Sequence, residues 1–153
     1  MKPDKLGKSI AIVFVVTLIS YLAVYNGIER RRVRNGPWQV TFTNDPAGTP
    51  ALLIDQSRLG ITNVQITFPG APKPVLASTN LSFAEPRPVP YDLPYGKCIF
   101  MDTTFLPGTL VLELFGHEVQ LLPRVLMIDR KEVAWRSGET IALPVSGTTN
   151  ENK

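Results

Sequence analysis

Few residues in this chain could carry out chemistry. Its 153 residues include one histidine, His117, and one cysteine, Cys98. Nucleophilic catalysis normally needs an imidazole base beside the nucleophile. His117 lies between Gly116 and Glu118, which is typical of a solvated turn residue, and adjacent strand side chains diverge, so His117 and Glu118 cannot bind one metal ion together. Cys98 lies in an apolar run and is interpreted as a small buried hydrophobe. We therefore expect no catalytic residue, metal or cofactor.

Other site signals are equally weak. Neither of the glycine-rich phosphate-binding patterns, GxGxxG and GxxxxGK[ST], occurs in the sequence. Paired carboxylates could serve glycoside chemistry, but no motif selects one pair from the acidic residues present. A carbohydrate-binding module or a carboxylate-dependent hydrolase, with Trp or Tyr stacking on sugar rings, therefore stays open only as an alternative function.

The charge distribution argues against a nucleic-acid-binding protein. The chain has a formal net charge of +3, but residues 1–34 hold seven basic and two acidic residues, whereas residues 35–153 hold nine basic and eleven acidic ones. A nucleic-acid-binding domain carries its positive charge as a patch on the folded part. Here the folded part is slightly acidic, so we expect no nucleic-acid partner.

The N-terminal segment has the composition of a membrane-spanning helix. Residues 9–28 contain no charged side chain, and twenty helical residues rise about 30 Å, which is the thickness of a hydrocarbon core. A cleaved signal peptide is the main alternative. It is disfavoured because the apolar stretch exceeds about 15 residues and no small-x-small cleavage site follows it.

Aromatic and basic residues flank the far end of this segment and indicate a membrane interface. We expect the bilayer to be one partner of the chain, contacted at this interface by an anchor collar of six residues: Tyr21, Tyr25, Arg30, Arg31, Arg32 and Arg34. Basic residues lie on both sides of the apolar segment, so the positive-inside rule is nearly balanced. We favour an extracytoplasmic location for the C-terminal part, since short basic N-termini commonly stay inside.

The remaining chain shows the two-residue period of β-strands. Trp38, Val40 and Phe42 alternate with polar residues, and Leu110, Leu112 and Leu114 alternate in the same way. Between residues 59 and 68 the apolar phase slips by one, which predicts a β-bulge near Thr62 and Asn63. Further short strand signals follow between turn residues. These patterns predict an all-β antiparallel sandwich or small barrel behind one N-terminal transmembrane helix. Its predicted core is Trp38, Val40, Phe42, Ile66, Leu110, Leu112, Leu114, Leu126, Ile128 and Trp135.

One segment departs from this pattern. Residues 69–97 contain seven prolines, so only short edge strands, at 75–77 and 80–83, are expected there. Stiff loops with aromatic and arginine residues can form binding surfaces, because they lose little entropy on docking. The candidate partner-binding residues are Phe83, Arg87, Tyr91 and Tyr95. The alternative is that these aromatic side chains cover a sheet edge internally.

These observations divide the chain into five parts and predict one function. The parts are a basic flank (1–8), a transmembrane helix (9–28), an Arg-rich juxtamembrane link (29–36), a β-domain (37–146) and a polar tail (147–153). The predicted function is that of a non-enzymatic interaction or scaffold protein of the cell envelope. Its partner would be another protein or a second copy of the chain.

Overall fold

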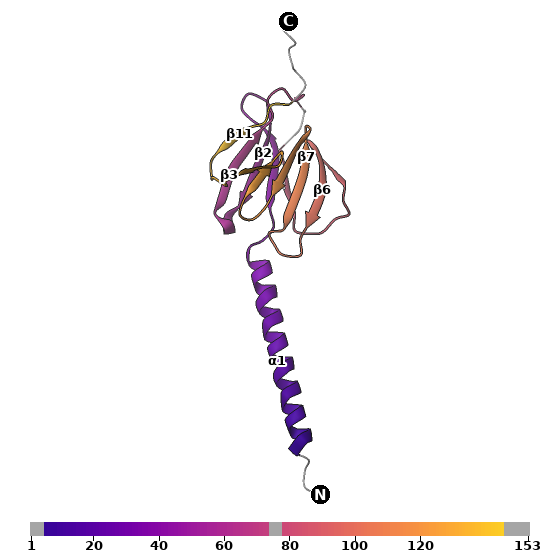
Figure 1. Ribbon diagram of the computed structural model, residues 1–153. Helices are drawn as coiled ribbons and strands as arrows, with labels where there is room; N and C mark the ends of the chain where they lie inside the picture. Colours follow the sequence, from indigo (N-terminus) through magenta and orange to yellow (C-terminus); the bar gives the residue numbers. More distant parts are fainter. Residues whose placement is uncertain (1–4, 74–77, 146–153) are drawn as a thin grey trace.

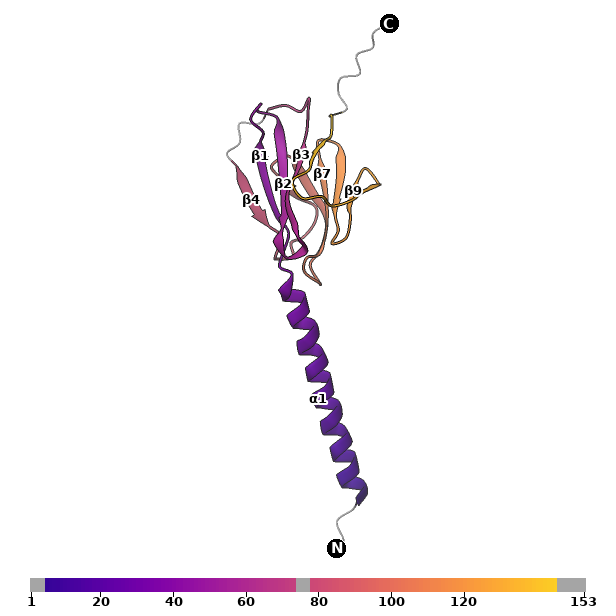
Figure 2. The same ribbon diagram turned by 90° about the vertical axis from the view of Figure 1, so that its left-hand side faces the viewer.

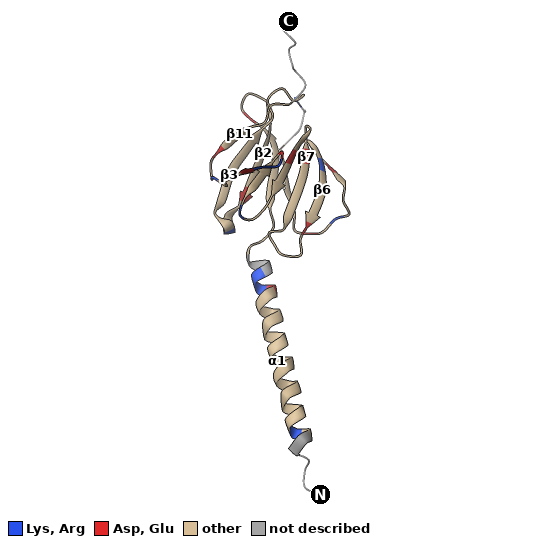
Figure 3. Cartoon of the chain, viewed as in Figure 1, with Lys and Arg blue, Asp and Glu red and all other residues tan. Residues whose placement is uncertain are grey.

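The computed structural model describes residues 5–73 and 78–145, and it consists of one long helix attached to a two-layered β-domain (Figure 1). Helix α1 (Lys5–Arg34) leaves one end of the domain roughly along the direction of the strands, as two perpendicular views show (Figures 1 and 2). Charged residues lie towards its two ends, and its middle carries no charged side chain (Figure 3). The predicted β-strand 75–77 and the polar tail 147–153 lie outside the described residues.

The helix is longer than the sequence pattern predicted. It continues through most of the expected juxtamembrane link and leaves only residues 35–38 between Arg34 and the first strand. Arginine and glutamate are good helix formers, and neither glycine nor proline occurs between Ile28 and Gly36. Gly36 has φ +66, the left-handed conformation that commonly follows the last helical turn.

The strands form two sheets that are not closed into a barrel, so of the two predicted architectures the sandwich is the one observed. The five-stranded sheet has the order β11 (Thr140–Ala142), β3 (Ile61–Thr67), β2 (Pro50–Gln56), β1 (Gln39–Asn44) and β4 (Thr79–Ser82). The six-stranded sheet has the order β10 (Lys131–Val133), β9 (Leu126–Ile128), β8 (His117–Leu121), β7 (Thr109–Leu114), β6 (Gly96–Asp102) and β5 (Tyr91–Leu93). A short 3-10 helix, η1 (Ser57–Leu59), joins β2 to β3.

Among the described strands, the pairing is antiparallel with one exception. Strand β11 runs parallel to β3, with Ile141 opposite Ile66, so the predicted antiparallel sandwich carries one parallel edge strand. The predicted bulge is confirmed: Val64 pairs with Ile54 and Ile61 pairs with Gln56, so Thr62 and Asn63 face the single residue between them. The apolar phase slip in the sequence is the signature of this extra residue.

The core lies between the two sheets and contains the residues that the alternation predicted. Nine of the ten predicted core residues are at most 6% exposed; the tenth, Trp135, is half-buried and packs against the core. Its ring lies 5.4 Å from that of Trp38. The hairpin turn after β9 is tight: only Asp129 and Arg130, both with positive φ, separate Ile128 from Lys131.

Candidate functional site

The end of the sandwich nearest to α1 holds the helix in a defined position. Gln56 is only 3% exposed, and its amide Nε2 donates hydrogen bonds to the carbonyl oxygens of Gly36, at 3.2 Å, and Pro37, at 2.9 Å. Its Oε1 accepts a third bond from the backbone N–H of Arg58. A buried strand residue therefore fixes the two carbonyls that follow the helix. We call residues 35–37 together with Gln56 the helix–sandwich junction.

Trp38 connects this junction to the opposite sheet. Its indole is 1% exposed, and its Nε1 donates a 2.6 Å hydrogen bond to the carbonyl oxygen of Gly108, which immediately precedes β7. The neighbouring Trp135 ring donates from Nε1 to the carbonyl oxygen of Leu122. Both indoles thus satisfy their polar atoms while their rings fill the core.

The loop between β6 and β7, residues 103–108, lies beside the last turns of α1. We call it the 103–108 loop. At its start the Asp102 carboxylate accepts a 2.8 Å bond from the backbone N–H of Thr104, and these contacts with Thr104 lower the pKa of Asp102. At its end the Gly108 backbone packs so closely that a Cβ there would lie 1.6 Å from the carbonyl oxygen of Asp102. The loop is therefore closed tightly at its base.

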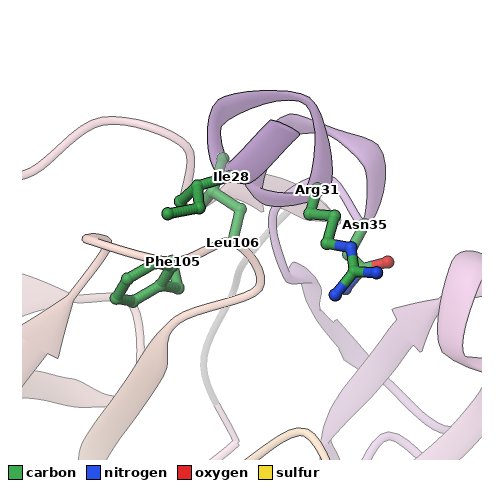
Figure 4. A pocket seen from close by; sticks show the side chains of 5 residues that line it. All are labelled: Ile28, Arg31, Asn35, Phe105 and Leu106. Carbon is green, nitrogen blue, oxygen red and sulfur yellow. The ribbon is translucent and has the colours of Figure 1, made fainter. Parts of the chain in front are cut away.

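Between these closing contacts the loop presents apolar side chains towards the helix. Phe105 is 62% exposed, more than Phe100 or Val89, the other exposed large hydrophobic residues described in the β-domain. A hollow of about 310 Å³ lies between the loop and α1, lined by Ile28, Arg31, Asn35, Phe105 and Leu106. Figure 4 shows Ile28, Phe105 and Leu106 on one side of this hollow and the Arg31 guanidinium beside Asn35 on the other. The hollow is therefore amphipathic.

The predicted membrane-interface residues lie along the exposed helix. The rings of Tyr21 and Tyr25 stack at 6.4 Å, and both side chains are more than half exposed. Arg30 and Arg31 are exposed in the turns that follow. Arg32 and Arg34 belong to the last turn of the helical backbone, but their side chains lie outside the described part of the structure.

The four candidate partner-binding residues divide into two pairs. Phe83 and Tyr95 are 4% and 5% exposed, and Tyr95 packs edge-on against Phe42 at 5.3 Å. The side chains of these two residues therefore belong to the core and are not exposed for contact with a partner. The proline-rich segment folds them back onto the sheets. The Tyr95 hydroxyl donates to the carbonyl oxygen of Thr43, and burial raises its pKa.

Arg87 and Tyr91 remain at the surface. The Arg87 guanidinium lies 5.7 Å from the centre of the half-buried Tyr91 ring, in a cation–π arrangement. Burial and a hydrogen bond with Cys98 raise the pKa of Tyr91. Cys98 itself is fully buried, as predicted, and burial raises the pKa of its thiol. A thiol in this environment is held in its unreactive protonated form.

His117 differs from the expected solvated turn residue. It is the first residue of β8, its side chain is 13% exposed, and its Nδ1 lies 2.7 Å from Oδ2 of Asp129. Its Nε2 lies 3.1 Å from the carbonyl oxygen of Pro144. Each ring nitrogen therefore faces a hydrogen-bond acceptor. The side chain thereby links the β9–β10 turn to the segment after β11.

The Asp129 carboxylate is the charged partner in this group. Its hydrogen bond with His117 holds its pKa below the usual range, and the backbone N–H of Glu118 donates a further bond. A carboxyl group whose pKa is lower in the folded than in the unfolded chain stabilises the fold above its unfolded pKa of about 3.9. That contribution disappears as the pH falls through the lower, folded-state value.

The described residues contain no group of three or more His, Cys, Asp or Glu side chains that could hold a metal ion. Two important positions were not found from the sequence. Gln56 has no sequence signal, because nothing in the local pattern shows that its amide meets carbonyls nineteen and twenty residues earlier. Phe105 had a weak signal, since it is an apolar residue between Thr104 and Pro107 in a segment without strand alternation.

Comparisons of the chain with protein-family models, with curated proteins and with solved structures found no match.

Proposed function

We propose that the chain is a single-pass membrane protein in which α1 crosses the bilayer and holds the β-sandwich at its surface. The sandwich would act as a non-enzymatic interaction or scaffold module of the cell envelope, facing away from the cytoplasm. One observation carries this proposal. Residues 7–31 form one continuous helix, and the apolar 18-residue stretch within it is not buried by the sandwich. Ile10, Phe14 and Ile19 are each at least 60% exposed, which lipid accommodates and water does not.

The junction supports a scaffold role. Only residues 35–38 separate the helix from β1, and the Gln56 amide binds two of their carbonyl oxygens. A flexible linker would let the domain move away from the bilayer. A short, hydrogen-bonded link instead keeps it at the surface with one end towards the lipid, so a partner meets the domain in a restricted set of orientations.

Exposed side chains are better candidates for partner contact than backbone pairing at a sheet edge. In the described part of the chain the four edge strands, β4, β5, β10 and β11, are each only three or four residues long. Short edge strands are one way in which proteins avoid edge-to-edge pairing. Arg87 and Tyr91 are residue types enriched at the energetic centres of interfaces, and they remain exposed or half-exposed. We therefore assign the partner-binding surface to them.

The carbohydrate-binding alternative has less support. A sugar site needs an exposed aromatic platform flanked by polar groups. Trp38 is 1% exposed, Trp135 packs against it, and Tyr95 is 5% exposed, which leaves Tyr91 as a half-buried ring already occupied by Arg87. This arrangement disfavours ring stacking on a sugar.

The first experiment tests membrane insertion. Alkaline carbonate extraction of native membranes should leave the full-length chain in the pellet. It should release a variant in which Val16→Arg and Ile19→Arg place two charges in the middle of the helix. Release of the wild-type chain by carbonate would contradict the anchor. An alkaline-phosphatase fusion to the C-terminus that stays inactive would reverse the proposed orientation.

The second experiment tests the partner surface. Tagged full-length chain is purified from detergent-solubilised native membranes, and the co-purifying proteins are quantified. Arg87→Ala should reduce their recovery, whereas Arg124→Ala, the same change at another exposed position, should not. Equal recovery with both variants, at equal melting temperatures, would reject this surface.

A further inference from the structure

We propose that the 103–108 loop is a second membrane contact, in which Phe105 and Leu106 insert into the boundary between headgroups and acyl chains while Arg31 binds a lipid phosphate. The inference rests on the proposed membrane anchor. It adds a lipid-binding surface within the β-domain, which the apolar helix alone does not imply. It also holds for either orientation of the chain, because the loop lies at the C-terminal end of the helix in both cases.

The depth of the loop follows from its position beside α1. The uncharged run of the helix ends at Ile28, so a bilayer that covers residues 9–28 places Ile28 at the edge of its hydrocarbon core. Phe105 and Leu106 line the same hollow as Ile28 (Figure 4). Side chains that share one small hollow lie at nearly the same depth. The loop therefore reaches the hydrocarbon edge whenever the helix spans the bilayer.

The exposure of Phe105 fits this environment better than water. Its side chain is 62% exposed, although the domain buries Phe42, Phe68 and Phe83 to 4% or less. Phe and Leu are typical of protein segments that lie with their apolar face 5–10 Å into the headgroup and acyl boundary. Burial of this ring in lipid would remove apolar surface from water that the fold itself leaves exposed.

The polar side of the hollow matches a lipid headgroup. Arg31 follows Ile28 by three residues, so it lies on a neighbouring part of the same helix surface, one turn further from the hydrocarbon core. Figure 4 shows its guanidinium beside Asn35, away from Phe105. Guanidinium groups bind phosphate through two parallel hydrogen bonds. An amphipathic lipid can therefore place its acyl chain against Ile28 and Phe105 and its phosphate against Arg31.

The loop is also prepared for insertion without a large loss of conformational freedom. Asp102 holds the backbone of Thr104, Gly108 packs against the backbone of Asp102, and the Trp38 indole binds the Gly108 carbonyl. Gln56 fixes the helix side of the same region. Both walls of the hollow are thus positioned by hydrogen bonds to the fold, and pre-organisation of this kind favours binding.

The test measures depth in the bilayer with single tryptophan substitutions in the full-length chain. The chain is reconstituted in vesicles of phosphatidylcholine and phosphatidylglycerol that carry bromine either near the headgroup or near the acyl-chain ends. The variants are Phe105→Trp, Ile19→Trp in the middle of the helix, and Ala47→Trp in the exposed turn at the opposite end of the sandwich. The fluorescence of Trp38 and Trp135 is measured in the wild-type chain and subtracted from that of each variant.

We expect shallow bromine to quench about half of the emission added by Phe105→Trp, deep bromine to quench that of Ile19→Trp, and neither to quench that of Ala47→Trp. If Ile19→Trp is quenched but Phe105→Trp behaves like Ala47→Trp, the loop contact is wrong and the anchor stands. If Ile19→Trp is not quenched by deep bromine, the anchor itself is wrong. Should Phe105→Trp lower the melting temperature, Thr104→Trp on the same loop replaces it.

A second measurement tests the phosphate contact. Native mass spectrometry counts the phosphatidylglycerol molecules that stay bound after the chain leaves detergent. Arg31→Gln should lose a bound lipid that Arg30→Gln retains, because Arg30 points away from the loop by the helical period. Equal lipid retention by the two variants would overturn the assignment of Arg31.

Discussion

At the helix–sandwich junction, we expect the substitution Gln56→Glu to destabilise the fold. The substitution keeps the size of the side chain but replaces its amide donor with a carboxylate. That carboxylate would face the carbonyl oxygens of Gly36 and Pro37, which now receive hydrogen bonds at 3.2 and 2.9 Å. Two hydrogen bonds of about 1 kcal/mol each are lost, and an anion is held against acceptors at a position that is 3% exposed. We expect a loss of about 3 to 5 kcal/mol at neutral pH, similar to other unpaired buried charges.

The pH dependence of the stability of this variant distinguishes the cost of a buried charge from a poor steric fit of the new side chain. Burial and the facing carbonyls disfavour the anion, so the folded-state pKa of the new carboxyl lies above its unfolded value of about 4.3. The folded chain then binds the proton more tightly than the unfolded chain. Relative to wild type, stability is therefore highest below about pH 4.3 and falls as the pH rises through the folded-state pKa.

The assay is urea unfolding of the full-length chain in detergent micelles, followed by the fluorescence of the paired indoles Trp38 and Trp135. Gln39→Glu is the matched control, because Gln39 donates to the Ser82 hydroxyl at a more exposed position, and it should cost less than about 1 kcal/mol. The reasoning is refuted if Gln56→Glu loses no more stability than Gln39→Glu. A difference from wild type that does not shrink at acidic pH would also refute it.

Three further predictions concern the sandwich and use the same unfolding assay. Leu112→Ala should cost about 2 to 5 kcal/mol, because Leu112 is 0% exposed, and Val111→Ala on the outer face should cost less than half as much; equal losses would show that the faces are misassigned. Gly108→Ala should unfold the chain or cost several times more than Gly138→Ala, whose Cβ would meet open space and suffer only from the positive φ. Asp129→Asn should be less stable than wild type at neutral pH, and the difference should disappear as the pH falls below about 3.9; a difference independent of pH would contradict the ionised contact with His117.

The β-sandwich could be predicted because period two is a local property of a half-buried strand. Leu110, Leu112 and Leu114 alternate with outward residues, and the structure buries all three to 1% exposure or less. The bulge at Thr62 and Asn63 was equally visible, since an extra residue reverses the phase of every later side chain in the strand. Local patterns of this kind determine which face is buried, but they carry no information about which strands become neighbours.

Contacts between distant residues could not be predicted for that reason. The parallel pairing of β11 with β3, the contact of His117 with Pro144, and the bonds from Gln56 to the junction join segments that are far apart in the sequence. The direction of the side chains in the proline-rich segment could not be predicted either. Its prolines correctly excluded long strands, but they did not reveal that Phe83 and Tyr95 point inward whereas Arg87 stays exposed.

The end of the helix links the two parts of the proposed mechanism. Gly36 adopts a left-handed conformation and Pro37 cannot continue a helix, so local chemistry ends α1 within two residues of Arg34. The Gly36 and Pro37 carbonyls that follow would need solvent, but Gln56 binds them instead. The signal that ends the helix is therefore also the contact that sets its position against the sandwich. Because that position places Phe105 in the same hollow as Ile28, the depth that we propose for the 103–108 loop in a bilayer follows from how the helix ends.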